Sequence, residues 1–202
     1  MIMNSTAIYG GSFNPIHFGH MDVAKAVIDE KAADELIFMP NYVSPFKLGN
    51  DYASGEDRKM MIKEATRDMD HVYVSEFELN RHRPSYTIET LEEMKRYIGG
   101  RISFVLGADS MLEIEDWERG CDILHKFALI VSFRPGINDE ITKKNANRLR
   151  DKYGTEICML NTMPRDVSSS DIVEALKSNK SISGMVPRSV EDYIRYHGLY
   201  RR

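Results

Sequence analysis

Apolar residues along the chain occur in two kinds of segment, short continuous runs and longer stretches with helical spacing. The short runs predict β-strands at residues 6–11, 35–40, 71–79, 101–109, 127–136 and 156–160. Between them, apolar residues recur every three or four positions. This spacing predicts helices at 19–31, 56–68, 87–98 and 139–152, a short helical stretch around Trp117, and two last helices from about Ser168 and Pro187.

This alternation of strands and helices decides the expected fold class. The runs at 102–106 and 128–131 are almost wholly apolar, which is typical of strands buried on both faces of a parallel sheet. We therefore expect an α/β fold, a doubly wound parallel sheet with a C-terminal helical tail. The 202 residues suit a single domain, 1–202, in which 161–202 forms a C-terminal α-helical subdomain.

Composition and charge narrow the range of functions. Apolar residues make up 42% of the chain, enough for a core, and no apolar stretch approaches the roughly 18 residues that a membrane span needs. The start, MIMNST, has no basic segment leading into an apolar one, so we expect no signal peptide. A net charge of -4 does not favour broad nucleic-acid binding. Cys121 and Cys158 fit no metal or redox motif, so we expect reduced thiols in a cytoplasmic protein.

The stretch GGSFNPIHFGH, residues 10–20, is the first candidate for chemistry. It lies between the first predicted strand and the first predicted helix, where open α/β sheets bind ligands. Gly10 and Gly11 let the backbone approach a ligand closely, and the N-terminus of the following helix suits a phosphate. His17 and His20 are three residues apart at that terminus, so both could contact one anion.

Other interpretations of this stretch can be compared on the residues. Neither the G-x-G-x-x-G pattern nor the P-loop pattern occurs, which argues against a pyridine-dinucleotide dehydrogenase and a P-loop kinase. The two histidines could also bind zinc, although no third ligand lies nearby, or could be a capping and packing pair.

Two motifs together carry a resemblance to a known family. GGSFNPIHFGH resembles the H-x-G-H signature of the nucleotidyltransferase superfamily, and VSSSDIV, residues 167–173, resembles its second motif, I-S-S-T-x-I-R. Further stretches resemble bacterial nicotinate-nucleotide adenylyltransferases over nearly the full length: FMPNYVSPFK, RPSYTIETL, FVLGADSM, VSFRPG and VPRSVEDYIRYHGLY. The resemblance implies a Rossmann-like nucleotidyltransferase fold. It also implies adenylyl transfer from ATP to nicotinic acid mononucleotide in NAD biosynthesis, giving deamido-NAD and pyrophosphate.

The resemblance also implies roles for particular residues. His17 and His20 would be catalytic. ATP would be bound by Gly10, Gly11, Ser12, Phe13, Gly107, Asp109, Arg134, Ser168, Ser169 and Ser170. The mononucleotide would be bound by Lys47, Tyr86, Thr87 and Trp117, with its ring on the indole and its carboxylate at the backbone N–H of Thr87. Mg²⁺ would accompany the triphosphate without protein ligands. The partners would be the two nucleotides, and we expect binding neither to nucleic acid nor to a membrane. A homo-oligomer is compatible with the sequence.

Several of these residues also have a plain structural interpretation. The serine run could simply cap a helix, and Asp109 could cap the helix that follows it. Lys47 could be a solvated charge, and Trp117, the only tryptophan, could be a core residue.

Two other functions stay open at this point. The same chemistry could act on nicotinamide mononucleotide or another phosphate acceptor, or the chain could be a non-catalytic nucleotide-binding relative. The sequence departs from the family pattern at Asn14 in place of Asp, Phe46 in place of His, Arg83 in place of Gly, and Val173 in place of the motif Arg. Of Arg134, Arg165 and Arg188, we expect Arg165 or Arg134 to supply the charge that Val173 lacks.

Overall fold

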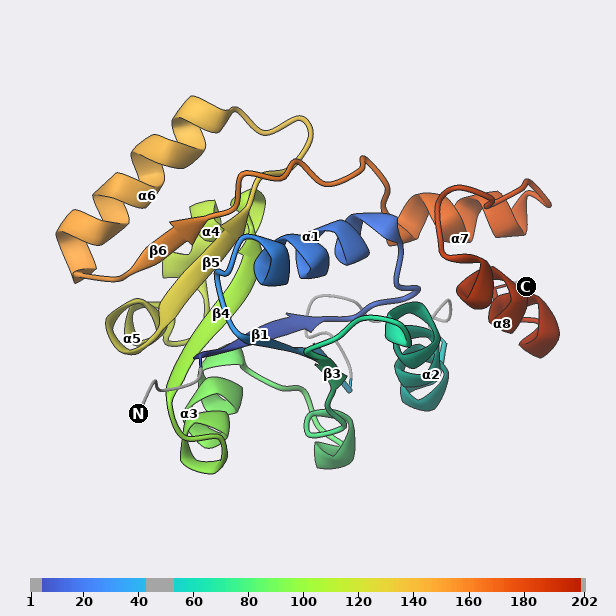
Figure 1. Cartoon of the computed structure of the whole chain (residues 1–202), viewed down its shortest axis with the longest axis horizontal. Coiled ribbons are helices and arrows are strands. Elements are labelled where there is room, and N and C mark those ends of the chain that lie inside the picture. Colours follow the sequence, from blue (N-terminus) through green and yellow to red (C-terminus); the bar gives the residue numbers. More distant parts are fainter. Residues whose placement is uncertain (1–4, 43–52, 201–202) are drawn as a thin grey trace.

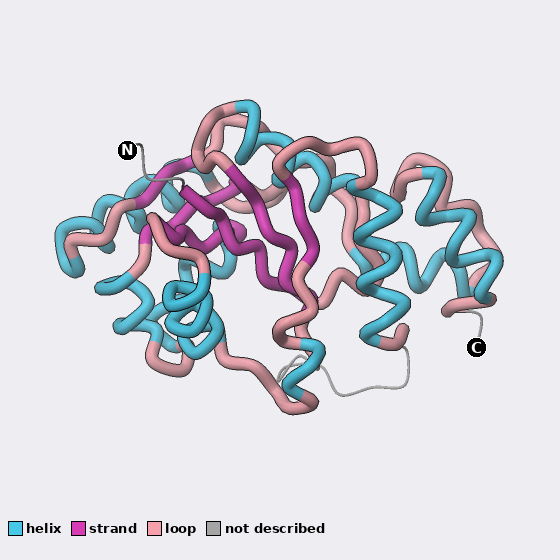
Figure 2. Tube along the Cα trace, turned by 60° about the horizontal axis from the view of Figure 1, so that its bottom comes forward, coloured by secondary structure: helices cyan, strands magenta, loops and turns pink. Residues whose placement is uncertain are grey.

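A computed structural model gives the arrangement of the chain and describes residues 5–42 and 53–200. One sheet has the strand order β3-β2-β1-β4-β5-β6, and every neighbouring pair is parallel. Figure 2 shows the strands as a central layer with helices on both sides. The strands are β1 (Ser5–Gly11), β2 (Glu35–Pro40), β3 (Val72–Val74), β4 (Arg101–Gly107), β5 (Ala128–Ser132) and β6 (Ile157–Met159). The prediction of a doubly wound parallel sheet is confirmed.

The helices follow the predicted order, and several of them begin at a side chain that caps them. Ser54 accepts a hydrogen bond from the backbone of Asp57 at the start of α2, and Asn138 does the same for two N–H groups of α6. The helices are α1 (Phe18–Asp29), α2 (Gly55–Thr66), α3 (Thr87–Tyr97), α4 (Ala108–Glu113), α5 (Gly120–Lys126), α6 (Asp139–Tyr153), α7 (Ser169–Lys177) and α8 (Arg188–His197), with 3₁₀ turns η1 (Leu79–Arg81) and η2 (Ile114–Asp116).

The two faces of the sheet bury separate hydrophobic clusters. Successive side chains of a strand point to opposite faces, so Ala7 of β1 joins one cluster and Ile8 joins the other. The Ala7 cluster includes buried residues of α1, α2, α7 and α8, and the Ile8 cluster those of α3, α4, α5 and α6. Helices therefore cover both faces, which explains why β4 is buried along 102–106.

The prediction of a long strand at 71–79 is wrong in its second half. The β3 ladder covers Val72–Val74, and the backbone N–H of Ser75 makes a last bond to Phe38 O. Beyond this point Glu76 pairs with Lys59 of α2, and Glu78 is buried. The apolar and polar residues do alternate here, but the polar ones bind helices on either side, so the chain turns instead of extending an edge strand.

The C-terminal helices pack against the body of the protein beside α2, as Figure 1 shows. Tyr193 Oη donates to Asp57 of α2 at 3.0 Å, and Ser189 Oγ donates to Glu64 O at 3.0 Å. Ile172, Val190 and Ile194 are fully buried in the Ala7 cluster. The division of the chain at residue 161 stays a prediction. Within the described ranges, none of the helices is both long and apolar enough to cross a bilayer.

We predict that replacing Ile194 by Ala lowers the free energy of unfolding by about 2–5 kcal/mol, the usual cost of a large-to-small change in a core. Because Ile194 packs in the cluster of β1 and α1, urea unfolding followed by circular dichroism should show one transition at a lower midpoint. Tyr196→Ala, in the same helix but 87% exposed, should change the midpoint little. A separate early transition in the Ile194 variant would show that the last helices unfold independently.

Candidate functional site

Two pockets lie at the carboxyl ends of the strands, one on each face of the sheet at the end of β1. The larger has a volume of about 450 Å³ and is lined in part by Ile8, Gly10 and Gly11. The smaller, about 130 Å³, is lined by Tyr9, His17, His20 and residues from the ends of β4 and β5, and we call it the histidine pocket. Along the chain β1 is followed by β2, on one side of it, whereas the strand on its other side, β4, is reached only after β3, and such a switch point is where open α/β sheets bind ligands.

His17 and His20 lie together at the N-terminus of α1. His17 is the N-cap residue, and its Nδ1 accepts a long hydrogen bond, 3.4 Å, from the backbone N–H of His20. The two rings stack with centroids 3.7 Å apart and planes at 26°. The prediction that both histidines share one side of this helix end is confirmed, and the capping interpretation is also correct for His17.

The surroundings of His17 keep its ring neutral. Its side chain is buried, and burial followed by the positive charge of Arg134 lowers the pKa of His17 from 6.5 to about 4. At neutral pH the ring therefore carries one proton. Because Nδ1 accepts a hydrogen bond, that proton lies on Nε2, which is then a donor.

Two of the three candidate arginines line the histidine pocket. Arg134 donates to Asp109 Oδ2 at 3.0 Å, and Arg165 binds Asp22 through Nε at 2.8 Å and Nη2 at 2.7 Å. The guanidinium of Arg165 also lies over the ring of Phe18, 3.9 Å from its centroid. Arg188 pairs with Asp192 within α8 and is not among the lining residues.

The three serines of the second motif differ in their contacts and in their exposure. Ser168 is the N-cap of α7: its Oγ accepts from the backbone N–H of Asp171 at 3.1 Å, and it lines the histidine pocket. Ser169 Oγ donates to Pro15 O at 2.9 Å, which ties α7 to the loop after β1. Ser170 is exposed. The helix-cap interpretation is thus correct for Ser168, and this cap lies beside the two histidines.

Gly107 and Asp109 lie at the end of β4. Gly107 is the N-cap residue of α4 and lines the histidine pocket, so the alternative that Asp109 caps this helix is wrong. Asp109 Oδ2 accepts from Arg134, while its Oδ1 is buried without a hydrogen-bond partner. A buried acceptor of this kind could receive a donor from a bound ligand.

Buried polar side chains hold the loop between β1 and α1 in place. Arg58 of α2 is 1% exposed and donates to Ser12 O at 2.7 Å and to Asn41 O at 2.7 Å. Asn14 Oδ1 accepts from Ala53 N–H at 2.9 Å and from the Tyr200 hydroxyl at 2.8 Å. At the position where the family pattern has Asp, Asn14 therefore serves the structure.

Ser12 and Phe13, two of the expected ATP contacts, line neither of the two pockets. The ring of Phe13 is buried beneath His20, with centroids 5.0 Å apart. Phe13 supports the histidine from the core, so its backbone, not its ring, is available for a contact with a ligand, whereas Ser12 is half-buried.

The larger pocket brings together Trp117 and the N-terminus of α3. Trp117 is half-buried: it packs against the Ile8 cluster, with the ring of Phe104 edge-on to it at 6.1 Å, and it also lines this pocket. Thr87 is the first residue of α3 and also lines the pocket. Tyr86 also lines the pocket, and its side chain is 41% exposed. The unpaired N–H groups of a helix N-terminus favour a negatively charged group.

Some lining residues were not anticipated from the sequence. Asn41 follows β2 directly, and its Oδ1 is buried without a partner. Glu78 is buried, burial raises the pKa of its carboxyl, and Thr90 Oγ1 donates to it at 2.5 Å. The sequence places Asn41 directly after a predicted strand, which is a usable signal for a residue that lines a binding site. The alternating run at 71–79, in contrast, does not indicate that Glu78 is buried. Lys47 and Phe46 lie outside the described residues.

The described residues offer no obvious protein cage for a metal ion. Among them, no three His, Cys, Asp or Glu side chains gather as ligands, and Cys121 and Cys158 are free and exposed. The histidine pair has no third ligand in the part of the chain that is described, so a zinc site is not supported there.

Comparison with known proteins gives a consistent result. A family model described as cytidylyltransferase-like matches residues 8–175. A relative from Caldicellulosiruptor bescii, named a probable nicotinate-nucleotide adenylyltransferase, is 37% identical over 196 residues, which cover 97% of this chain and 98% of the relative. A relative of the same name from Carboxydothermus hydrogenoformans is 33% identical over 195 residues, 96% of each chain.

Solved structures give the same fold. Nicotinic acid mononucleotide adenylyltransferase of Plasmodium falciparum, complexed with NaAD, matches with a TM-score of 0.80 at 20% identity, covering 98% of this chain and 97% of that one. At this identity the match is an argument for the fold alone.

We predict that His17 makes stability depend on pH. Its pKa is about 4 in the folded protein against 6.5 in the unfolded chain, so between these values the unfolded state binds more protons. The free energy of unfolding then falls as the pH is lowered through this window. At about 1.4 kcal/mol per pKa unit the loss attributable to His17 is about 3 kcal/mol. Urea unfolding at both ends of the window, for the wild type and for His17→Asn, measures it.

Asparagine is a good N-cap residue, so the His17→Asn variant keeps a capping side chain at the start of α1 and removes the titrating ring together with its stacking on His20. The wild type should lose more stability on acidification than this variant. Equal losses in the two proteins would contradict the lowered pKa.

Proposed function

The chain belongs to the cytidylyltransferase-like family, and we propose that it transfers the adenylyl group of ATP to nicotinic acid mononucleotide and releases pyrophosphate. The observation that carries this proposal is the pair of pockets on either side of the end of β1. One has the donors that a polyphosphate needs, and the other has an aromatic side chain and a helix N-terminus suited to a flat ring with an acidic group.

The larger pocket is the proposed site for the mononucleotide. Its volume of about 450 Å³ falls in the range of small-molecule sites. The pyridine ring would stack on Trp117, and its carboxylate would meet the free N–H groups at the start of α3, with Thr87 first among them. We propose that Tyr86 contacts the mononucleotide at the rim of this pocket and that Lys47 also contacts it.

The histidine pocket is the proposed site for the ATP phosphates. Donors converge there from three elements: His17 and His20 from the start of α1, Arg134 from the end of β5, and the N-cap Ser168 of α7. Charge-assisted hydrogen bonds from such groups are about twice as strong as neutral ones. The other ATP contacts we propose are Gly10, Ser12, Gly107, Asp109, Ser169, Ser170 and the backbone of Gly11 and Phe13.

The reaction needs no nucleophile from the protein. An oxygen of the mononucleotide phosphate forms a bond to the α-phosphorus of ATP, and the bond from that phosphorus to the bridging oxygen breaks, so pyrophosphate leaves. The second pKa of a phosphate monoester is about 6, so the attacking group is already mostly ionised at pH 7. The residues therefore act by holding the two nucleotides in line and by stabilising charge.

The neutral ring of His17 suits this role. Its Nε2–H can donate to a phosphoryl oxygen without first losing or gaining a proton. Negative charge on a bound triphosphate favours the imidazolium, which opposes the lowering of the pKa by burial and Arg134.

The proposal also covers the metal ion, the cellular location and the partners of the protein. Mg²⁺ bound to the triphosphate would neutralise part of its charge. No cluster of protein ligands for it was found among the described residues, so we propose that ATP itself carries the ion. We also propose that the protein acts in the cytoplasm, that its partners are the two nucleotides, and that it can form a homo-oligomer.

One observation favours nicotinamide mononucleotide as an alternative acceptor. Glu78 lines the larger pocket, and a carboxylate there could accept a hydrogen bond from an amide NH₂ and would repel an acid. Against this, burial raises the pKa of Glu78, and its carboxyl already accepts from Thr90. The N-terminus of α3 favours the acid, so we prefer it.

We predict that His17→Ala and His20→Ala each reduce turnover by roughly 10²- to 10³-fold, since one charge-stabilising contact in such a site is worth ~3–4 kcal/mol. Pyrophosphate release at saturating substrates measures this effect. His197→Ala, an exposed histidine of α8, is the matched control and should leave turnover unchanged. Near wild-type turnover in either folded variant would remove that histidine from the mechanism.

The substrate itself is tested by assaying the acid and amide mononucleotides with ATP and Mg²⁺. We expect kcat/KM to favour the acid by roughly 5- to 150-fold, because a donor left facing the amide NH₂ costs about 1–3 kcal/mol. Equal values would contradict the preference, and Glu78→Gln would then show whether Glu78 holds the amide. If no mononucleotide gives pyrophosphate, the chain is a non-catalytic relative.

A further inference from the structure

The segment that carries Trp117 is a short loop with little support of its own. This Trp117 loop, residues 114–120, joins α4 to α5 and begins with the turn η2. Its internal bonds are few: Trp117 N–H donates to Ile114 O at 3.2 Å, and Gly120 N–H donates to Trp117 O at 2.9 Å. The indole is half-buried and packs on one side against the Ile8 cluster, so the loop backbone that carries it also determines how it faces the pocket.

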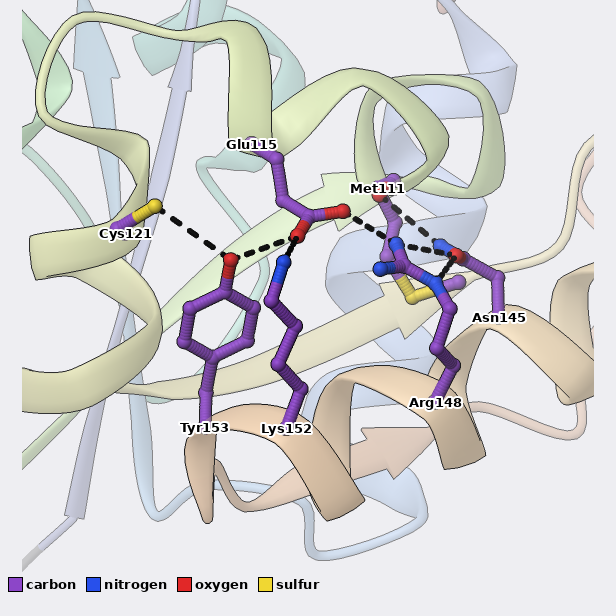
Figure 3. A network of polar contacts seen from close by, with 7 residues as sticks. All are labelled: Met111, Glu115, Cys121, Asn145, Arg148, Lys152 and Tyr153. Carbon is purple, nitrogen blue, oxygen red and sulfur yellow. Dashed lines mark hydrogen bonds and ion pairs between the residues drawn. The ribbon is translucent and has the colours of Figure 1, made fainter.

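One residue of this loop, Glu115, is bound by a neighbouring helix. Its carboxylate accepts from three residues of α6: Lys152 Nζ at 2.8 Å, the Tyr153 hydroxyl at 2.6 Å, and Arg148 Nη2. Figure 3 shows the three donors reaching Glu115 from one side of α6. Hydrogen bonds from Arg148 and then Lys152 hold the pKa of Glu115 well below its usual range, so its charge is present at neutral pH.

The same helix also holds the chain before and after the loop. Asn145 Nδ2 donates to Met111 O at 3.3 Å, and Asn145 Oδ1 accepts from Arg148 Nε at 3.0 Å. On the other side of Trp117, Cys121 Sγ and the Tyr153 hydroxyl are 3.5 Å apart. In Figure 3 these contacts form one continuous network with Glu115 between them.

The acidic neighbours of Trp117 do not replace this support. Asp116 and Glu118 flank the indole, are exposed, and line the larger pocket. On the far side of the loop, Arg119 binds Glu92 of α3 through Nη2 at 2.8 Å. Glu115 is therefore the anchor of the loop to α6, two residues from the ring that faces the ligand.

We propose that Glu115 is a positioning residue for the pyridine-binding pocket: by binding Arg148, Lys152 and Tyr153 of α6 it fixes the Trp117 loop, and so the indole on which the ring stacks. The proposal rests on the proposed function for the identity of the ligand. The effect on the position of the indole does not depend on the proposed function, because that position can be measured in the protein without a ligand.

The energetics favour an effect on binding over an effect on folding. Ion pairs near the surface contribute at most about 1 kcal/mol each to stability, so the fold should survive loss of one carboxylate. Displacement of a stacking side chain, in contrast, weakens a contact made directly with the ligand.

The test compares Glu115→Gln with the control Glu156→Gln. Glu156 also pairs with an arginine, Arg101, but at the start of β4, at the opposite end of the strand from the pockets. For Glu115→Gln we expect the KM for the mononucleotide to rise about 5-fold, the fold-change that corresponds to about 1 kcal/mol, with kcat and the KM for ATP unchanged. The control should leave all three constants unchanged.

The single tryptophan supplies a readout that needs no activity. In Glu115→Gln without ligand, the emission of Trp117 should shift to longer wavelength and be quenched more strongly by acrylamide than in the wild type or Glu156→Gln. High salt screens exposed ion pairs. It should therefore also shift the Trp117 emission of the wild type to longer wavelength, and it should shift the emission of Glu115→Gln less.

The outcomes separate the two proposals. Unchanged emission, quenching and KM in folded Glu115→Gln would overturn the positioning role, and so would an equal rise in the KM for ATP. If the wild type does not use the mononucleotide at all, the proposed function fails, while fluorescence still decides the role of Glu115. Should Glu115→Gln not fold, Lys152→Met removes one donor and must shift the emission, or the role is wrong.

Discussion

The position of β1 between β2 and β4 is the constraint on which the rest of the molecule depends. Right-handed connections place α1 and α2, which lie between β1, β2 and β3 along the chain, on one face of the sheet, and α3 to α6, which lie between β3 and β6, on the other. Because side chains alternate, Ile8 and Tyr9 also face opposite sides, and each lines a different pocket. The glycines after them let the backbone pass between the two pockets without a side chain in the way. Two ligands can therefore meet at one strand end.

Helix N-termini supply much of the chemistry at that meeting point. His17 caps α1 and Ser168 caps α7 beside the histidine pocket, and Thr87 begins α3 beside the larger one. Each offers backbone N–H groups that have no partner within their own helix. A chain of net charge -4 thus presents local positive potential to anions without a basic surface. This arrangement suits a reaction in which charge must be held and no proton need be removed from a nucleophile.

The sequence predicts the parts of this site that depend on neighbours along the chain. The loop after β1, the histidines at the start of α1 and the serine cap of α7 all follow from local order. Contacts between distant residues could not be predicted this way. The binding of Glu115 by α6 and the pairing of Arg134 with Asp109 depend on which helix lies beside which strand. The early end of β3 has the same origin, because Glu76 and Glu78 bind groups on two different helices.

The two arginines of the histidine pocket are not equivalent substitutes for the charge that Val173 lacks. Arg165 uses two donors on Asp22 and its guanidinium lies over the ring of Phe18, so much of its charge is already balanced and its position is fixed. Arg134 makes a single bond to Asp109, and its field reaches His17, whose pKa it lowers. A triphosphate beside His17 would experience that same field as attraction, because the charge that disfavours an imidazolium favours an anion. We therefore infer that Arg134 supplies the phosphate-binding charge and that Arg165 shapes the wall of the pocket.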